Sequence, residues 1–253
     1  MNIIIDLDNV QNWPVALRAF LETHYDVFLG WEEDQNRPHP STYDAAIYGL
    51  ADALQPYALI GWHCTRLTDE EAERITTSGM GLPNGDVLER RIDALVQQGL
   101  ITASVAIDLK ADHQADDRYR AGRVWFCFFP PRIGDEHGIG SFFRFWGGEA
   151  LYRSHDRHPI NSMALRAVGT PSIVEAEVPI ALLDSAVGLA FKIVRRYLIH
   201  RGYRTNEPYD HEDRIVRALP PNCILRIHRF PEPRFLELSG CEDWREPLVG
   251  PRR

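Results

Sequence analysis

A chain of 253 residues allows one large domain, or one domain with a small appendage. Its net charge of −8 opposes indiscriminate binding to nucleic acid, and no run approaches the roughly 18 apolar residues of a membrane span. Four widely separated cysteines without a C-x-x-C pair argue against a zinc knuckle and a disulfide framework. The start of the sequence lacks the basic region and cleavage site of a signal peptide, so we expect a soluble, cytoplasmic protein that does not contact a membrane.

Residues 1–57 are predicted to form an N-terminal strand and helical extension packed on a main domain of residues 58–253. An Ile-rich strand opens this layer and is followed by Asp6 and Asp8. Paired carboxylates after a strand can hold Mg²⁺ in metal-dependent hydrolases, although the further acidic, Lys or Ser/Thr motifs of such a fold are not evident. Asp-Asn is also common turn chemistry, so this alternative stays open beside a structural turn.

A predicted strand over residues 60–65 ends in His63 and Thr65, directly before a helix. Thr68 and Glu71 have the spacing of a capping box, in which a hydroxyl and a carboxylate each bind a free backbone N–H. Two polar side chains between a strand end and a helix start favour a binding site over a core. A histidine satisfied by backbone groups is the structural alternative.

The middle of the chain alternates between helical and extended patterns. Apolar residues at helical spacing predict a helix from Asp86 to Gln98, and alternation over residues 101–109 predicts a half-buried strand. The polar segment 111–122 is predicted to be mobile or to form a lid, and an aromatic strand covers residues 124–129.

The last third of the chain is predicted to contain a strand over residues 173–180 and a long helix from Leu182 to His200. Two late strands follow, near residues 214–217 and 223–230. Helices and strands are therefore interspersed, which predicts an α+β or mixed α/β single domain.

The order of His63-x-Thr65, a short helix and Gly79 resembles the first nucleotide-binding segment of the ADP-ribosyltransferase superfamily. The resemblance is to its DarT-like branch, which uses a His at this place and a distant Glu for catalysis. It implies an α+β fold of split mixed/antiparallel β-sheets flanked by helices, with NAD as co-substrate. In that family the His and the Thr-like residue hold the nicotinamide ribose, so the resemblance assigns this role to His63 and Thr65.

Two further segments carry the resemblance. Residues 123–132 resemble the aromatic strand and Pro-Arg turn that follow the His motif, and residues 138–152 combine Gly pairs with aromatic residues that can stack on a planar cationic ring. A solvated Arg at a core strand, and a Trp packed beside a glycine bulge, are the structural alternatives. The resulting candidates are Arg132 and Arg144 for the NAD phosphates, and Trp146 and Tyr152 for the nicotinamide.

Residues 209–224 resemble the terminal segment of many ADP-ribosyltransferases, in which a Glu precedes a hydrophobic pair, a Pro turn and a last strand. Glu212 is therefore the predicted catalytic carboxylate. It would stabilise the positive charge that develops at ribose C1′ as nicotinamide leaves. Glu175 and Glu177 form the E-x-E pattern of arginine-modifying members, and they remain rivals for this role.

The resemblance predicts transfer of ADP-ribose from NAD to a macromolecule, either DNA, RNA or protein. A toxin or defence enzyme of this kind would be accompanied by a neutralising antitoxin or immunity protein, by analogy. Two alternatives stay open: a non-catalytic nucleotide- or protein-binding module of the same fold, and a metal-dependent hydrolase that uses Asp6 and Asp8. For the transferase, no metal is expected at the site.

Overall fold

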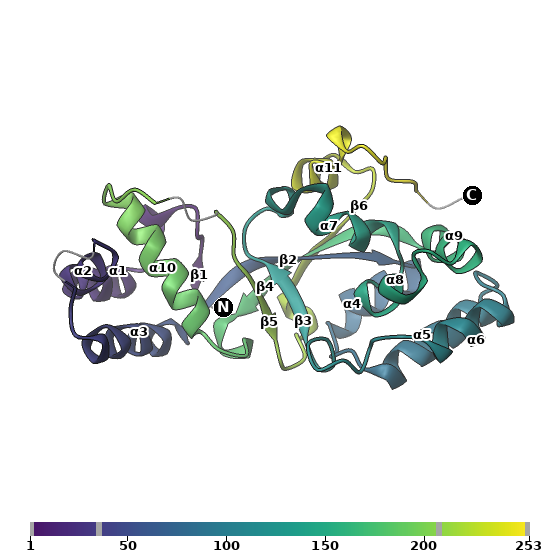
Figure 1. Cartoon of the computed structure of the whole chain (residues 1–253), viewed down its shortest axis with the longest axis horizontal. Coiled ribbons are helices and arrows are strands. Elements are labelled where there is room, and N and C mark those ends of the chain that lie inside the picture. Colours follow the sequence, from purple (N-terminus) through teal and green to yellow (C-terminus); the bar gives the residue numbers. More distant parts are fainter. Residues whose placement is uncertain (1–2, 34–36, 206–208, 251–253) are drawn as a thin grey trace.

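A computed structural model of the chain describes residues 3–33, 37–205 and 209–250. This part of the chain is an α+β fold in which helices flank a six-stranded sheet (Figure 1). The fold class expected from the sequence is thereby confirmed.

The central strand of the sheet is β2, and β4 pairs antiparallel with it over ten residue pairs from Ala58 to Leu67. β6 continues the sheet beyond β4, and β3 and β5 lie on the other side of β2. β1 runs parallel to the first residues of β2. The strands are β1 (Ile3–Ile5), β2 (Tyr57–Leu67), β3 (Val124–Cys127), β4 (Thr170–Pro179), β5 (Glu212–Ile215) and β6 (Ile224–Arg229).

β2 and β3 diverge almost as soon as they meet. Only the pair Trp62 and Cys127 is in register between these two strands, whereas β4 follows the opposite edge of β2 throughout. β1 and β3 therefore share one edge of β2 at different positions along it. The split sheets expected from the resemblance are replaced, among the described strands, by one mixed sheet that opens between β2 and β3.

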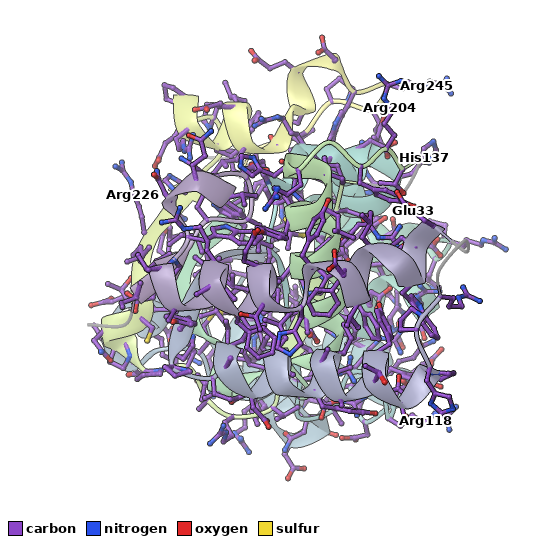
Figure 2. The ribbon with its side chains drawn as sticks, turned by 90° about the vertical axis from the view of Figure 1, so that its left-hand side faces the viewer. Glu33, Arg118, His137, Arg204, Arg226 and Arg245 are labelled. Carbon is purple, nitrogen blue, oxygen red and sulfur yellow. The ribbon has the colours of Figure 1, made fainter. Side chains whose placement is uncertain are left out.

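The N-terminal helices share the main hydrophobic core with a late helix and the sheet. In Figure 1 they form a group at one end of the molecule, beside β1. Figure 2 looks at the molecule from that end, and the labelled Arg118, Arg226 and Arg245 lie at its periphery. The helices of this group are α1 (Val15–Thr23), α2 (Tyr25–Glu33), α3 (Pro40–Leu54) and α10 (Val187–His200).

Two smaller cores lie away from this end of the molecule, and one of them packs on β2 and β4 through Cys64 and Ile173. One is built by helices of the middle of the chain, and the other by α7 (Asp135–Arg144), α11 (Pro233–Ser239) and the C-terminal segment (Figure 1). The helices of the middle region are α4 (Asp69–Ser78), α5 (Gly85–Gln97), α6 (Ala103–Ala111), α8 (Glu149–His155) and α9 (Pro159–Ala167). Within the described residues, no helix is both long enough and apolar enough to cross a lipid bilayer.

The predicted strand over residues 101–109 is wrong, because this segment is helix α6. The hydroxyl of Thr102 accepts the N–H of Val105 and caps the helix. Val105, Ala106 and Leu109 are buried at helical spacing, while the side chain of Ile107, which fits the alternation, is 68% exposed. A short run of alternating apolar residues fits both the two-residue period of a strand and the 3.6-residue period of a helix. The N-cap at Thr102 favours the helix.

Other local signals are confirmed. Thr68 and Glu71 form the predicted capping box at the start of α4, and α5 occupies the predicted helix region. The long late helix starts at Val187 and not at Leu182, because residues before it pair with β5: Asp184 N–H donates to the carbonyl of Arg214. The segment 111–122 contains turns and is joined to the N-terminus of α5 by Asp116, which accepts Gly85 N–H at 2.8 Å.

Candidate functional site

A cavity of about 700 Å³ opens where β2 and β3 diverge. Its walls come from α4, α5, α7 and α8 as well as from the two strands, and all three hydrophobic cores contribute side chains to it. Concave sites of this size are typical of small-molecule pockets. Four of the site residues predicted from the sequence line it: His63, Thr65, Tyr152 and Glu212.

His63 bridges the opening between the two strands. Its Nδ1 lies 2.9 Å from the carbonyl oxygen of Trp125, and since a carbonyl only accepts, Nδ1 carries the proton. Nε2 is therefore the acceptor. Burial lowers the pKa of His63 and the positive charge of Arg91 adds to this, against the backbone hydrogen bond, which raises it. The imidazole is neutral at neutral pH, with an acceptor nitrogen available to a ligand.

Trp62, next to His63 on β2, also contributes to the cavity lining. Its indole Nε1 is buried and has no hydrogen-bond partner in the described part of the chain. A buried donor without a partner is rare in folded proteins and is commonly satisfied by a ligand or water. Trp62 and His63 are consecutive residues of a strand, so their side chains point to opposite faces of β2, and Trp62 packs in the core that contains Cys64.

Glu212 lies at the end of β5, next to β3. The thiol of Cys127 donates to Glu212 Oε1 at 3.7 Å, and Cys127 pairs with Glu212 across the two strands. The pKa of Cys64 is well above its ordinary value because of its interaction with the Cys127 thiol, its burial and the nearby charge of Glu212. Cys64 is thus a protonated thiol at neutral pH, and it is unsuited to act as a nucleophile.

Glu71 and Trp146 hold Arg91 in the cavity wall. Glu71 Oε1 accepts Arg91 Nε–H at 2.7 Å, and Glu71 Oε2 accepts both Trp146 Nε1–H at 2.9 Å and Thr68 N–H at 3.0 Å. The Arg91 guanidinium lies 4.7 Å from the centre of the Trp146 ring. Burial alone would raise the pKa of Glu71, but Arg91 and the hydrogen bonds from Thr68 and Trp146 lower it, so Glu71 is ionised.

A second charged cluster in the lining centres on Glu149 of α8. Glu149 accepts from Arg153 Nη2 at 2.8 Å and from the Tyr152 hydroxyl at 3.2 Å, and its other oxygen lies 3.4 Å from Arg120 Nε. Burial and then the charge of Glu149 raise the pKa of Tyr152 to about 12. Tyr152 is therefore a neutral phenol whose hydroxyl donates to Glu149 and whose ring forms part of the lining.

The lining carries a positive excess. Its three carboxylates, Glu71, Glu149 and Glu212, face five guanidinium groups, which gives 5 − 3 = +2 with neutral histidines, and two of the five are also paired with carboxylates outside the lining. The whole chain has the opposite sign, at −8. A cavity of this charge in an acidic protein favours an anionic ligand. The five arginines are Arg74, Arg91, Arg120, Arg123 and Arg153.

Three predicted ligand-binding residues lie outside the cavity lining. Trp146 is completely buried behind Arg91, so it cannot stack directly on a ligand ring. Arg144 is 9% exposed and forms ion pairs with Glu136 and Glu246. Arg132 lies in a short 3-10 helix, with its Nη1 at 3.4 Å from the carbonyl oxygen of Glu237. The structure thus gives the two arginines protein partners away from the site.

The rival carboxylates on β4 are also away from the cavity lining. Glu175 Oε2 is 2.6 Å from Nε2 of the buried His228, and neither Glu175 nor Glu177 lines the cavity.

Asp6 Oδ1 accepts the N–H of Asp8 at 2.9 Å in a local turn. No group of three or more His, Cys, Asp or Glu side chains among the described residues could hold a metal ion. The described geometry gives no support to a metal centre at the two aspartates.

Arg91, Trp62 and Cys127 are site residues that sequence reasoning missed. Arg91 precedes Ile92 on the amphipathic helix α5, where it reads as an ordinary solvated charge. A possible signal was Glu71, because an acidic capping residue has a second oxygen that can hold a cation. Nothing local in the sequence indicates that this cation comes from α5.

Comparison with known proteins identifies no relative: no protein-family model, no curated protein and no solved structure matches this chain.

Proposed function

We propose that the chain is an NAD-dependent ADP-ribosyltransferase that acts on a macromolecule. The observation that carries the proposal is that His63 and Glu212, which come from distant parts of the sequence, both line the cavity that opens where β2 and β3 diverge. The sequence resemblance assigns the same two residues to one NAD site. The positive lining is consistent with a dinucleotide that carries a diphosphate.

In this proposal β2 holds the nicotinamide ribose. His63 Nε2 accepts a hydrogen bond from a ribose hydroxyl, because Nδ1 already donates to Trp125. Thr65 lies two residues further along the strand, on the same face as His63, and can bind the same half of the ligand. The Tyr152 ring is the remaining predicted partner of the nicotinamide that lines the cavity.

Glu212 supplies the electrostatic part of catalysis. As the bond between ribose C1′ and the nicotinamide nitrogen breaks, positive charge develops at C1′, and a carboxylate beside it stabilises this charge. A nucleophilic atom of the acceptor then bonds to C1′ and releases its proton to Glu212. Glu212 is exposed at the cavity, so an acceptor can approach it from outside.

The cavity leaves the acceptor open among DNA, RNA and protein. We assign the reaction to the cytoplasm, where NAD is available and where the four free thiols of the chain fit a reducing environment. If the transfer harms the cell that makes the protein, a neutralising antitoxin or immunity protein is its expected partner.

The decisive experiment follows nicotinamide release and label transfer from NAD to DNA, RNA and protein. We expect Glu212→Gln to lower the rate by about 10²–10³-fold, which is typical of losing one group that stabilises transition-state charge. Glu177→Gln is the matched control, because Glu177 lies on β4 outside the cavity lining and should retain the rate. Equal rates for both variants contradict the role of Glu212. Binding of NAD without any release favours a non-catalytic nucleotide-binding module.

A further inference from the structure

Arg91 differs from the other cavity arginines in how it is held. Its Nε is bonded to Glu71 and one face of its guanidinium is stacked on Trp146. Its two terminal nitrogens, Nη1 and Nη2, have no hydrogen-bond partner in the described part of the chain, although the side chain is only 26% exposed. Two parallel N–H groups of a fixed guanidinium are thus available to the cavity.

Both supports of Arg91 are themselves fixed. Glu71 is 8% exposed and uses both oxygens, and Trp146 is completely buried with its indole N–H on Glu71. A free arginine side chain loses about 2 kcal/mol of rotamer entropy when it is immobilised. In this protein most of the rotamer entropy of Arg91 is already lost on folding. A ligand that binds Arg91 therefore does not have to compensate for it.

A purely structural ion pair is the competing explanation. An arginine that serves only to neutralise a carboxylate often does so through two parallel N–H···O bonds. Arg91 makes only one such bond to Glu71. It uses Nε and leaves the two terminal nitrogens outside the ion pair. Its charge also acts on His63 across the cavity, where it lowers the imidazole pKa. Arg91 therefore lies close enough for its charge to act on the predicted ribose-binding residue as well as on Glu71.

We propose that Arg91 anchors a subsite for a phosphate group of a nucleotide diphosphate, and that Glu71 and Trp146 are positioning residues that act through it. A planar fork of two N–H groups matches two oxygens of a phosphate. The size of the cavity and its aromatic walls suit a nucleotide better than a small carboxylic acid. The identification of that nucleotide as NAD rests on the proposed function; the phosphate subsite does not.

Calorimetric binding to the full chain tests the subsite with ADP, ADP-ribose, adenosine and inorganic pyrophosphate. Arg91→Gln should weaken ADP and ADP-ribose binding by at least about tenfold and leave adenosine binding unchanged, because charge-assisted hydrogen bonds to phosphate are lost. Arg74→Gln is the matched control: Arg74 also lines the cavity as a cation, but it is 52% exposed and paired with Glu70 on its own helix. We expect less than about threefold weakening in this control.

Other outcomes separate the alternatives. Unchanged ADP binding by Arg91→Gln overturns the subsite, and so does an equal loss in the Arg74→Gln control. Pyrophosphate that binds as tightly as ADP overturns the assignment to a nucleotide and identifies a site for inorganic anions. If ADP binds through Arg91 but NAD is never cleaved, the transferase proposal fails while the subsite stands.

The positioning role needs a readout that a simple packing role would not change. Trp146→Phe keeps a ring under Arg91 but removes the N–H that holds Glu71, and we expect ADP binding to weaken by about two- to fivefold with binding of adenosine retained. Wild-type ADP affinity in a folded Trp146→Phe protein contradicts the role. If that variant does not fold, Arg91→Lys keeps the charge and loses the fork. Its ADP affinity should then fall about tenfold, and wild-type affinity overturns the proposal.

Discussion

His63 is the residue whose chemistry the structure specifies most completely. The Trp125 carbonyl fixes the tautomer, and burial together with Arg91 lowers the imidazole pKa below its ordinary 6.5. If neutral His63 binds the ribose, the rate of nicotinamide release should be constant from pH 8 down through 6.5 and should fall only at lower pH. A pH–rate profile tests this, and a fall centred at 6.5 or above contradicts it.

Arg91 should influence that profile directly. Arg91→Gln removes a positive charge that helps to lower the His63 pKa, so the pKa should rise toward 6.5. NMR titration of the His63 imidazole measures this without any ligand or turnover. Arg74→Gln again serves as the control, and an unchanged His63 pKa in Arg91→Gln contradicts the interaction between the two residues.

His211, next to Glu212 in the sequence, should make the stability of the protein depend on pH in the acidic range. Burial and then Lys192 lower its pKa to about 4, so the folded state keeps this imidazole neutral while the unfolded chain binds a proton below 6.5. Proton binding therefore stabilises the unfolded state as the pH falls from 6.5 to about 4, and the free energy of unfolding decreases over this range. His211→Gln should reduce the decline of Tm over this range, as measured by thermal melts, whereas an unaltered decline excludes His211 as its source.

At the scale of elements, the end of α4 depends on one glycine. Gly79 has φ of +79°, and a Cβ placed there would lie 2.0 Å from the carbonyl oxygen of Leu219, which is backbone and cannot rotate away. Gly79→Ala should therefore cost about 3 kcal/mol of stability, from backbone strain and this clash. Gly81→Ala, at a neighbouring cavity position where nothing lies within 4 Å of the new Cβ, is the matched control in denaturant unfolding. Equal losses in both variants contradict the argument.

The same helix shows what the sequence can and cannot predict. The capping box and the terminal glycine of α4 follow from local rules, so the sequence predicts this helix correctly. The sequence misplaces residues 101–109, because short apolar alternation also fits helix α6. The contacts of Arg91 with Glu71 and Trp146 cannot be predicted from the sequence. They join α4, α5 and the α7–α8 connection, and they depend on how the cores pack.

The candidate site follows the same division. His63, Thr65 and Glu212 stand in motif-like segments, and they do line one cavity. Arg144 and Trp146 also stand in a suggestive segment, but the chain there turns into helices, and both side chains are buried against other partners. Sequence spacing indicates which residues have suitable chemistry, whereas the packing of α7 and α8 decides which of them reach the cavity.

At the scale of the whole molecule, the described residues before β2, which are 3–33 and 37–56, contribute to the main core. β1 pairs with the start of β2, and buried residues of α1 and α3 share one hydrophobic cluster with α10 and the sheet. Leu17, Leu21, Ile47, Leu50 and Leu54 are each at most 1% exposed. Together they form the layer that covers this end of the sheet.

Truncation should therefore prevent folding, even though the candidate site lies outside this layer. Removing residues 1–56 exposes the apolar faces of α10 and β2, and exposed apolar surface of this extent causes aggregation. We expect the fragment 57–253 to be insoluble or to lack a cooperative thermal transition, and co-expression with residues 1–56 to restore it in part. Circular dichroism melts of both preparations measure this. A fragment 57–253 that melts cooperatively and binds ADP as the full chain does would show that the first 56 residues are separable from the rest of the chain.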